Sequence, residues 1–398
     1  MFRKVSTGIS VAALGIILAA RADVAPEPIS KVPTDMPTAH MVNSGYKVVE
    51  VASGLDRPWS MAFLPDGSML VTERPGRLRI IRGGKLLSDA VANVPTVYTK
   101  SPSKLYQAGL FDVVLHPKFA ENNILYLTYA SGNDGANATR VMRARFDGKA
   151  LLDAKVIFEA RPLKDTANHF GGRMAFLPDG TFLLTVGEGF EYREKAQDLS
   201  TDLGKIIRLN DDGSVPKDNP FVAKKSALPE IYSLGHRNEQ GLIYDAINSR
   251  VLETEHGPQG GDELNVIEPG RNYGWPVITY GMDYTGAYVT PYTAWPGMEQ
   301  PRVQWTPSIA PSGLALYTGD KFANWKGDLF VGSLKFMQLR RLDLDESGRV
   351  QGQEILMSET KQRIRDVRVG PDGFLYVATD HEPGEPSGGR VLRLEPAG

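Results

Sequence analysis

The sequence predicts an all-β protein that folds as a six-bladed β-propeller, and three observations favour this fold class. The 398-residue chain contains 41 glycines and 27 prolines. They make up about a sixth of its length against an average of about 12%, which indicates many turns and many short strands. Helical periodicity is sparse, whereas apolar β-type runs recur along the whole chain. Finally, six hairpin-like segments follow one pattern at similar intervals.

Three copies of the hairpin pattern contain the turn Pro-Asp-Gly between two apolar runs. These copies begin at Met61, Met174 and Val367. Pro presets φ at the second position of such a turn, and Asp and Gly tolerate the tight bend. Apolar, β-rich runs on both sides therefore predict a β-hairpin in each copy.

Three weaker copies with longer turns lie between these and begin near Asp112, Gly241 and Leu314. The steps between copies are roughly 50 to 70 residues, about the length of a four-stranded blade with its loops. Closure of the ring would pair the early strand 46–51 with the last strand 391–394. Two β-sandwiches are the rival architecture, but the repeat count favours one propeller.

The N-terminal residues 1–22 are expected to form an export signal. Two basic residues precede the apolar run 11–20, which is too short to span a bilayer, and a small-x-small cleavage site ends at Ala22. An uncleaved membrane anchor is the alternative. Residues 23–44 form a polar, Pro-rich segment, and residues 45–398 form the single propeller domain. The mature protein is therefore expected to be periplasmic or secreted, without stable membrane insertion.

Charge and composition exclude several classes of function. The formal net charge is −2 at pH 7, so no basic excess is available to neutralise a nucleic-acid backbone, and no nucleic-acid partner is expected. The chain contains no cysteine, which excludes disulfides, zinc–thiolate sites, iron–sulfur clusters and thiol nucleophiles. Outside the cytoplasm, the fold must then be stabilised by burial or by metal.

Polar residues beside the hairpins are candidates for chemistry, because propellers gather functional groups around their central channel. His169 is a candidate general base, and the glycines that follow it allow a ligand to approach the backbone. A structural loop histidine is the alternative. Arg237 and Asn238 lie in a dense polar run before the fourth hairpin, where they either bind a ligand or form a surface turn.

A glycine-rich segment, residues 255–265, interleaves glycines with oxygen-bearing residues. Carbonyl and carboxylate oxygens are the ligands that calcium prefers. The spacing differs from that of an EF-hand loop, and a solvated acidic loop is the alternative.

Cationic residues adjoin the last two hairpins. Lys335 ends the fifth hairpin, and Arg363 and Arg365 enter the sixth on one face of a strand, with Ile364 opposite. Two cations on one face repel unless an anion lies between them, although a solvated edge explains them equally. A ring would bring these three cations and Arg237 to one end of the channel, which predicts a small polyanionic ligand.

Eight short motifs occur in order at residues 54–59, 107–110, 169–173, 235–241, 272–276, 310–312, 333–335 and 363–367. This set resembles the soluble quinoprotein sugar dehydrogenases, which use pyrroloquinoline quinone (PQQ) and calcium on a six-bladed propeller. The resemblance covers roughly residues 45–395. It is closer to the broad aldose sugar dehydrogenase branch than to the narrower glucose dehydrogenase branch.

The resemblance implies a role for each candidate near the reacting centre. His169 matches the general base that removes the proton of the sugar C1 hydroxyl while hydride passes from C1 to C5 of the quinone. Arg237 and Asn238 match residues beside the quinone carbonyls, where an Arg stabilises developing negative charge. Gln107 matches a polar contact near this centre, and Tyr284 a cofactor-contacting aromatic residue.

The resemblance also implies calcium ligands. Gly257 and Pro258 match positions whose backbone carbonyls hold the calcium that also binds PQQ. That ion would polarise the quinone as a Lewis acid. Glu263 and the carbonyl of Tyr273 resemble a second, structural calcium site.

Three cations match the groups that clamp the PQQ carboxylates, namely Lys335, Arg363 and Arg365, in agreement with the polyanionic ligand inferred above. One departure concerns the base. Asn168 precedes His169 where glucose-oxidising members carry Asp, so we expect a neutral neighbour to hold His169 less strongly.

These implications define the predicted function. The chain is expected to be a PQQ- and calcium-dependent aldose dehydrogenase that oxidises the sugar C1 hydroxyl to a lactone. Electrons would pass to an external acceptor, and the protein would be a monomer or a homodimer. Two alternatives remain: an exported propeller that binds glycan or protein without catalysis, and a metal-dependent propeller lactonase, which has no evident use for the cationic set.

Overall fold

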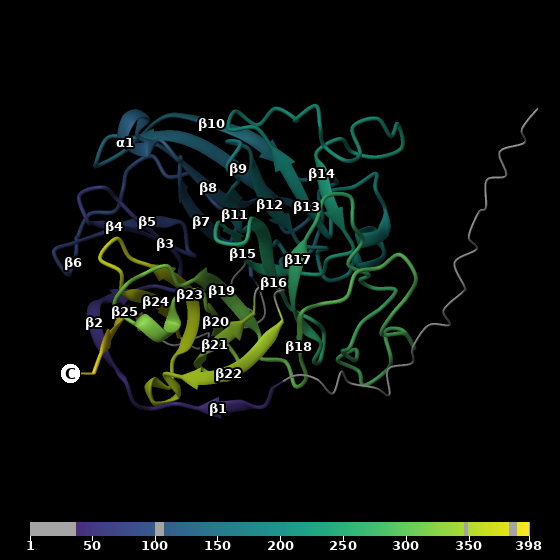
Figure 1. Cartoon of the computed structure of the whole chain (residues 1–398). Coiled ribbons are helices and arrows are strands. Elements are labelled where there is room, and N and C mark those ends of the chain that lie inside the picture. The colour runs from purple at the N-terminus through teal and green to yellow at the C-terminus, as the bar shows by residue number, and fades with distance from the viewer. Residues whose placement is uncertain (1–36, 100–106, 346–348, 382–387, 398) are drawn as a thin grey trace, which may run out of the picture.

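The computed structural model describes residues 37–99, 107–345, 349–381 and 388–397. Within these ranges the chain forms six sheets that are arranged around a centre as the blades of a β-propeller (Figure 1). The predicted fold class, an all-β six-bladed β-propeller, is confirmed. The predicted export signal at residues 1–22 and most of the polar segment 23–44 lie outside the described residues.

Each blade is an antiparallel meander of four strands. From the innermost strand outward, blades one to three are β3 (Pro58–Phe63), β4 (Met69–Glu73), β5 (Arg77–Arg82) and β6 (Lys85–Leu86); β7 (Leu110–Leu115), β8 (Ile124–Asn133), β9 (Ala136–Phe146) and β10 (Leu151–Glu159); and β11 (Met174–Phe176), β12 (Phe182–Val186), β13 (Lys205–Leu209) and β14 (Ile231–Leu234).

The other three blades follow in the same order along the chain. They are β15 (Glu239–Asp245), β16 (Arg250–Glu255), β17 (Asp262–Ile267) and β18 (Val303–Trp305); β19 (Pro311–Leu316), β20 (Leu329–Ser333), β21 (Gln338–Leu344) and β22 (Val350–Leu356); and β23 (Arg363–Val369), β24 (Leu375–Asp380), β25 (Gly389–Pro396) and β2 (Tyr46–Leu55). Each of the six predicted hairpins begins in the innermost strand of a blade, and neighbouring innermost strands contact one another around the ring.

The Pro-Asp-Gly turns have the geometry that their composition predicts. Their glycines, Gly67, Gly180 and Gly373, all have φ between +79° and +84°, which is the left-handed region that glycine enters without steric cost. In the first turn, the amide of Gly67 donates to the carbonyl of Leu64 at 2.9 Å. These turns therefore set the register between the innermost strand and the second strand of their blades.

The ring closes as predicted, by pairing of an early strand with the last strand of the described chain. Strand β2 pairs antiparallel with β25, with Val48 opposite Leu394. Figure 1 shows the purple β2 beside the yellow C-terminal strand. Because the last blade takes its outer strand from the N-terminal part of the propeller, opening the ring requires this pairing to break.

One strand lies outside the predicted plan. Strand β1 (Ala39–Met41) falls within the segment predicted to be merely polar and Pro-rich, and it pairs parallel with β22, with Ala39 opposite Gln353. Strand β22 is the outer edge of blade five, and an edge strand offers unpaired backbone groups. A three-residue strand leaves little hydrophobic pattern from which to predict this pairing.

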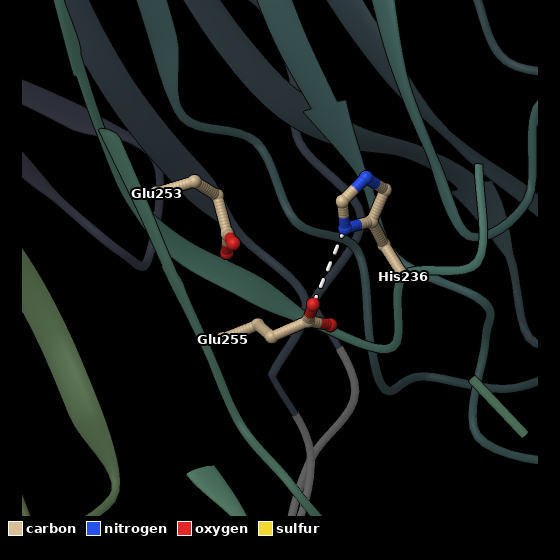
Figure 2. A group of neighbouring side chains, drawn as sticks. All are labelled: His236, Glu253 and Glu255. Carbon is tan, nitrogen blue, oxygen red and sulfur yellow. Dashed lines mark hydrogen bonds and ion pairs between the residues drawn. The ribbon is translucent and has the colours of Figure 1, made fainter. Parts of the chain in front are cut away.

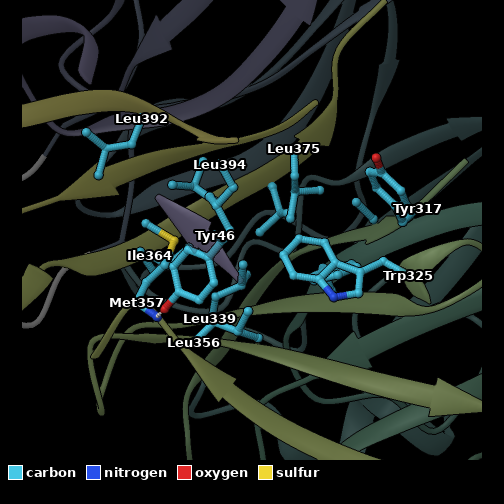
Figure 3. Packing of buried hydrophobic residues seen from close by; sticks show 14 of the residues in the cluster. Tyr46, Tyr317, Trp325, Leu339, Leu356, Met357, Ile364, Leu375, Leu392 and Leu394 are labelled. Atoms are coloured by element: carbon cyan, nitrogen blue, oxygen red, sulfur yellow. Dashed lines mark hydrogen bonds between the residues drawn. The ribbon is translucent and has the colours of Figure 1, made fainter. Parts of the chain in front are cut away.

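The hydrophobic core lies between adjacent blades. Figure 3 shows the cluster between blades five and six, where Tyr46 of β2 and Leu394 of β25 pack near Trp325. The Trp325 ring stacks on Phe322 with a centroid distance of 3.7 Å, and the hydroxyl of Tyr46 accepts a hydrogen bond from the amide of Met357 at 2.8 Å. Full burial of each large apolar side chain stabilises the fold by about 1.5–3 kcal/mol, so this cluster helps to hold the closed ring.

Helices are few in the described residues. The structure has α1 (Phe119–Asn122) and short 3-10 helices at Arg193–Gln197, Ala323–Trp325 and Ser358–Thr360. In this part of the chain, no helix has the length and apolar character needed to cross a membrane.

Candidate active site

A cavity of about 220 Å³ lies at one end of the propeller channel. Its lining comes from the starts of innermost strands, such as Trp59, Phe111 and Arg365, and from the ends of second strands and the loops that follow them, such as Asp380 and His256. In an antiparallel blade these two ends share one edge, so the fold gathers them on one face. The other lining residues are Arg57, Arg74, Gln107, Phe170, Gly171, Asn238, Gln240, Ala310, Leu334, Arg363 and His381.

Positive charge dominates the cavity wall. Arg57, Arg74, Arg363 and Arg365 line it, whereas Asp380 is the only carboxylate among the lining residues that the structure describes. Arg365 is buried, and its Nη2 lies 3.7 Å from Oδ2 of Asp380. Burial and the neighbouring arginines lower the pKa of Arg365 to about 9, although Asp380 opposes this shift. An anionic ligand would relieve the repulsion between these guanidinium groups.

Of the four cations expected to converge, Arg363 and Arg365 line the cavity as a pair on one strand face. Ile364 points the other way and is fully buried in the core between blades five and six. Nη1 of Arg363 donates to the carbonyl of Leu334 at 3.3 Å. Lys335 does not line the cavity: its side chain is exposed, and Nζ lies 5.7 Å from the Phe336 ring centroid.

The predicted base His169 lies immediately beside the cavity and is only 4% exposed. Its amide donates to Oε1 of Gln107 at 2.9 Å, which ties the backbone of the base to a cavity-lining side chain. Its Nδ1 lies 2.7 Å from Oε1 of Glu188, which is fully buried. His169 and Glu188 therefore form a buried imidazole–carboxylate pair.

Glu188 corrects the expectation that His169 has a neutral neighbour. The residue before the base, Asn168, is neutral, but the side chain that contacts the imidazole is a carboxylate from the loop after β12. Sequence reasoning missed Glu188 because it is distant from His169 along the chain. Its signal was an acidic residue between Gly187 and Gly189, directly after a buried strand.

Burial sets the protonation of this pair. It lowers the pKa of His169 well below the usual value, and the positive charges of Arg237 and Lys164 lower it further. Burial raises the pKa of Glu188 to about 7, against the opposing effect of Arg237. At neutral pH and above, a neutral His169 can donate its Nδ1 proton to ionised Glu188, which leaves Nε2 able to accept a proton.

Asn238 offers a donor to a ligand. It is 1% exposed and lines the cavity. Its Oδ1 accepts hydrogen bonds from the amide of Gly171 at 3.4 Å and from Nε2 of Gln240 at 3.2 Å. Its Nδ2 has no hydrogen-bond partner among the described residues. Buried polar atoms normally have a partner, so this amide group is suited to a ligand carbonyl oxygen.

Arg237 lies at a smaller, adjoining cavity. This second cavity is lined by Arg237, Gly257, Glu263 and Tyr273, and it shares His256 with the first. Nη1 of Arg237 donates to the carbonyls of Gly257 at 2.6 Å and of His256 at 3.1 Å. The structure thus brings Arg237 together with three of the four predicted calcium ligands.

The remaining predicted ligand and the aromatic candidate are placed differently. Pro258 is buried but is absent from the lining of both cavities. Tyr284 is 61% exposed and also lies outside both linings. Its ring is 6.2 Å from that of Phe190, which in turn packs edge-on against His169 at 5.1 Å. The ring of Phe190 therefore lies between Tyr284 and the base His169.

Acidic side chains line or adjoin the second cavity. Nδ2 of Asn265 donates to carboxylate oxygens of Glu253, Glu255 and Glu263 at 3.2, 3.3 and 3.2 Å. Burial and then Glu255 raise the pKa values of Glu253 and Glu263 well above the usual value. The hydroxyl of Tyr273 donates to the carbonyl of Val266 at 2.6 Å and accepts from the amide of Glu268 at 2.8 Å, so the carbonyl of Tyr273 is the candidate ligand. This oxygen-rich donor set fits a divalent cation.

Arg173 is a further residue that sequence reasoning did not single out. Its Nη1 lies 3.0 Å from Oδ1 of Asp366, its Nε donates to the carbonyl of Gln240 at 2.7 Å, and its guanidinium lies 4.0 Å from the Trp59 ring centroid. It thereby joins innermost strands of several blades directly behind the cavity wall. The sequence feature that could have indicated its role is the position of a cationic residue just before an apolar innermost strand.

Comparisons with known proteins identify the family of the chain. The sequence profile of the family described as Glucose / Sorbosone dehydrogenase matches residues 55–393. The chain is 42% identical over 353 residues to aldose sugar dehydrogenase YliI of Escherichia coli (strain K12), covering 86% of this chain and 91% of that protein. It is 28% identical over 445 residues to quinoprotein glucose dehydrogenase B of Acinetobacter calcoaceticus, covering 92% and 90%.

Solved structures give the same result. The apo-form crystal structure of the soluble aldose sugar dehydrogenase from Escherichia coli superposes with a TM-score of 0.83 at 39% identity, covering 88% of this chain and 100% of that one. The PQQ-bound aldose sugar dehydrogenase from Streptomyces coelicolor gives a TM-score of 0.72 at 28% identity, covering 90% and 99%. The resemblance inferred from the motifs is confirmed, and the chain belongs to the glucose/sorbosone dehydrogenase family.

Proposed function

We propose that the chain is a PQQ- and calcium-dependent aldose dehydrogenase that oxidises the C1 hydroxyl of an aldose to a lactone. It is exported under the direction of residues 1–22, acts in the periplasm or outside the cell, and passes electrons to an external acceptor. Relatives named aldose sugar dehydrogenase and quinoprotein glucose dehydrogenase support the reaction class. The observation that carries the proposal is the buried His169–Glu188 pair beside a cavity walled by arginines.

His169 and Glu188 supply the general base. Ionised Glu188 accepts the Nδ1 proton of His169 and fixes the tautomer in which Nε2 has a free lone pair. That nitrogen removes the proton of the C1 hydroxyl, and the growing positive charge on the imidazole is stabilised by the carboxylate 2.7 Å away. The hydrogen bond from the His169 amide to Gln107 holds the backbone of the base in place.

The first cavity has the donors that PQQ requires. Arg363 and Arg365, with Arg57 and Arg74 nearby, offer planar donor groups to its carboxylates. The unpartnered Nδ2 of Asn238 is available to a carbonyl oxygen. When bound, PQQ would supply the quinone that accepts hydride from the sugar C1. Exposed Lys335 would act at the rim, and Tyr284 would flank the entrance.

Oxygen-bearing groups of the second cavity, together with the neighbouring carbonyl of Pro258 outside its lining, support calcium binding. We assign the carbonyls of Gly257 and Pro258 to the ion next to PQQ, and Glu263 with the carbonyl of Tyr273 to a structural ion. The carbonyl of Gly257 already accepts a hydrogen bond from Arg237, but a carbonyl oxygen has two lone pairs and can serve both. When bound, calcium would supply Lewis-acid polarisation of the quinone.

The lactonase alternative is disfavoured by the acids near the channel axis. A metal-dependent lactonase needs carboxylates that are free to bind an ion at the channel centre. Here Asp366 pairs with Arg173 at 3.0 Å, and Asp112 pairs with Arg368 at 3.1 Å. These acids stabilise the ring, and the cavity above them is cationic.

Reconstitution tests the proposal. The purified chain is titrated with PQQ in excess calcium, and dye reduction is then measured with a panel of aldoses. We expect saturable PQQ binding and sugar-dependent dye reduction. Absence of PQQ binding together with absence of dye reduction by any aldose would overturn the proposal, and lactone hydrolysis without PQQ would support the lactonase alternative.

A further inference from the structure

A second cluster of potential ligands adjoins the proposed calcium cavity, which one of its members, Glu255, also lines, and the cluster has no part in the proposed reaction. It consists of His236, in the loop after β14, and of Glu253 and Glu255, which are alternate residues on one face of β16. One ligand atom from each lies within 4.8 Å of the other two. Figure 2 shows the three side chains directed toward a common space. Their exposed fractions are 0%, 0% and 4%.

We propose that His236, Glu253 and Glu255 bind a divalent transition-metal cation, with Zn²⁺ as the representative ion, at a site separate from calcium. Calcium selects oxygen ligands, whereas a set that includes an imidazole suits zinc and its neighbours. The ion would be structural, because the three ligands are buried and lie outside the lining of the PQQ cavity.

Unpartnered oxygens are the first observation that calls for a cation. Oε1 of Glu253 has no hydrogen-bond partner among the described residues, and neither oxygen of Glu239 has one. Glu239 is fully buried and lies directly opposite Glu255 in the pairing of β15 with β16. Buried charges are normally paired or bound to metal. The single NH₂ group of Asn265 is shared among three carboxylates and does not neutralise them.

The orientation of the His236 ring is the second observation. Its Nε2 lies 2.8 Å from Oγ of Ser233, and its ring stacks on Tyr273 with a centroid distance of 4.8 Å. A metal-bound imidazole typically donates its other N–H to such a partner. In the tautomer that donates Nε2–H to Ser233, Nδ1 has a lone pair 3.2 Å from Oε1 of Glu255, whereas in the other tautomer Nδ1–H donates to that oxygen. Two lone pairs at this distance repel unless a cation lies between them.

The separations are compatible with one ion. Structural zinc is tetrahedral and lies about 2.0–2.2 Å from nitrogen and oxygen ligands, so two ligand atoms are about 3.3–3.6 Å apart. The widest separation in the cluster is no more than 4.8 Å. Binding would therefore require the most widely separated ligand atoms to approach one another by at most about 1.5 Å. A proton shared between Glu253 and Glu255, with Nδ1–H donated to Glu255, is the competing arrangement.

The test measures zinc binding in excess calcium, which fills the all-oxygen sites, and it needs neither PQQ nor sugar. The chelator-treated chain is dialysed against Zn²⁺ and Ca²⁺, and its metal content is measured by inductively coupled plasma mass spectrometry. We expect the unmodified chain to bind about one zinc ion more than the Glu253→Gln variant. The variant should bind zinc at least about 100-fold more weakly, because it lacks one of the proposed ligands. Zinc should also raise the Tm of the unmodified chain and leave that of Glu253→Gln unchanged.

Two further variants make the test specific. Ser233→Ala should weaken zinc binding by about 10–100-fold, because the alcohol orients the imidazole. Glu263→Gln is the matched control: it removes a carboxylate assigned to calcium and should retain the zinc. Anomalous scattering at the zinc edge should place the ion at Nδ1 of His236. Equal zinc content in the unmodified chain and Glu253→Gln would overturn the proposal in favour of the shared proton, and loss of zinc from Glu263→Gln would show that no separate site exists.

Discussion

Nδ1 of His169 lies 2.7 Å from Oε1 of Glu188, and both side chains are buried at the edge of the arginine-lined cavity. The two residues come from different loops of blade three, one before β11 and one after β12. Because the carboxylate fixes the imidazole, the protonation state of Glu188 determines whether His169 can act as a base.

The first prediction concerns pH. Glu188 has a pKa of about 7, so it is protonated below this pH and no longer accepts the Nδ1 proton of His169. We expect turnover with saturating aldose to rise as the pH increases through about 7. In Glu188→Gln, turnover should fall by about 10²-fold or more, and this rise should disappear because the amide does not titrate in that range. Steady-state kinetics from pH 5 to 9 provide the check. An unaltered profile in Glu188→Gln would assign the titration to another group.

The second prediction separates two proposed clamps of the PQQ carboxylates. Arg365 is 7% exposed, whereas Lys335 is solvent-exposed. Loss of a buried charged partner costs about 2 kcal/mol or more, so PQQ affinity should fall at least about 30-fold in Arg365→Gln. An exposed charge contributes about 1 kcal/mol at most, so Lys335→Gln should weaken binding by less than about 5-fold. Fluorescence titration with PQQ measures both. A larger loss in Lys335→Gln would contradict the assignment.

The third prediction concerns the stability of the ring. Arg173→Met leaves Asp112 and Asp366 at the channel axis without one of their charged partners, and breaking a buried ion pair costs about 3 kcal/mol. Arg140 pairs with Glu159 on the surface, where both side chains are 37% exposed, and Arg140→Met should cost less than about 1 kcal/mol. Urea unfolding followed by circular dichroism compares the two free energies of unfolding. Equal losses would show that Arg173 does not stabilise the axis.

The fourth prediction concerns calcium. Burial and Glu255 raise the pKa of Glu263 well above its usual value, so in the metal-free fold this carboxyl keeps its proton at acidic pH. Calcium must displace that proton, and its affinity should therefore increase with pH. We expect calcium to raise Tm more at pH 7.5 than at pH 5, and Glu263→Gln to lose this difference. The same calcium effect at both pH values would place the ion elsewhere.

The fold was predictable because each blade repeats one local pattern. The Pro-Asp-Gly turns after Met61 and Met174 have a backbone geometry that their residue types specify. The apolar runs 46–51 and 391–394 lie at the two ends of the repeats and were left without another partner, so their pairing could be predicted. Strand β1 was missed, since three residues on the edge of blade five show no hydrophobic period.

The candidate site was only partly predictable. Arg363 and Arg365 follow from strand alternation, and both line the cavity. Glu188 and Arg173 act through contacts between loops and across blades, which depend on how the ring closes and leave no spacing in the sequence. Lys335 matched its motif, but the exposure of its side chain was not readable from sequence.

The central claim is that His169 removes the proton of the sugar C1 hydroxyl. The most direct measurement is an anaerobic single-turnover experiment, in which the chain loaded with PQQ and calcium is mixed with an aldose and loss of the quinone absorbance is followed. The unmodified chain should reduce its cofactor rapidly. His169→Ala, with PQQ still bound, should do so about 10²–10⁴-fold more slowly. Equal rates in the two proteins would contradict the assignment of His169 as the base.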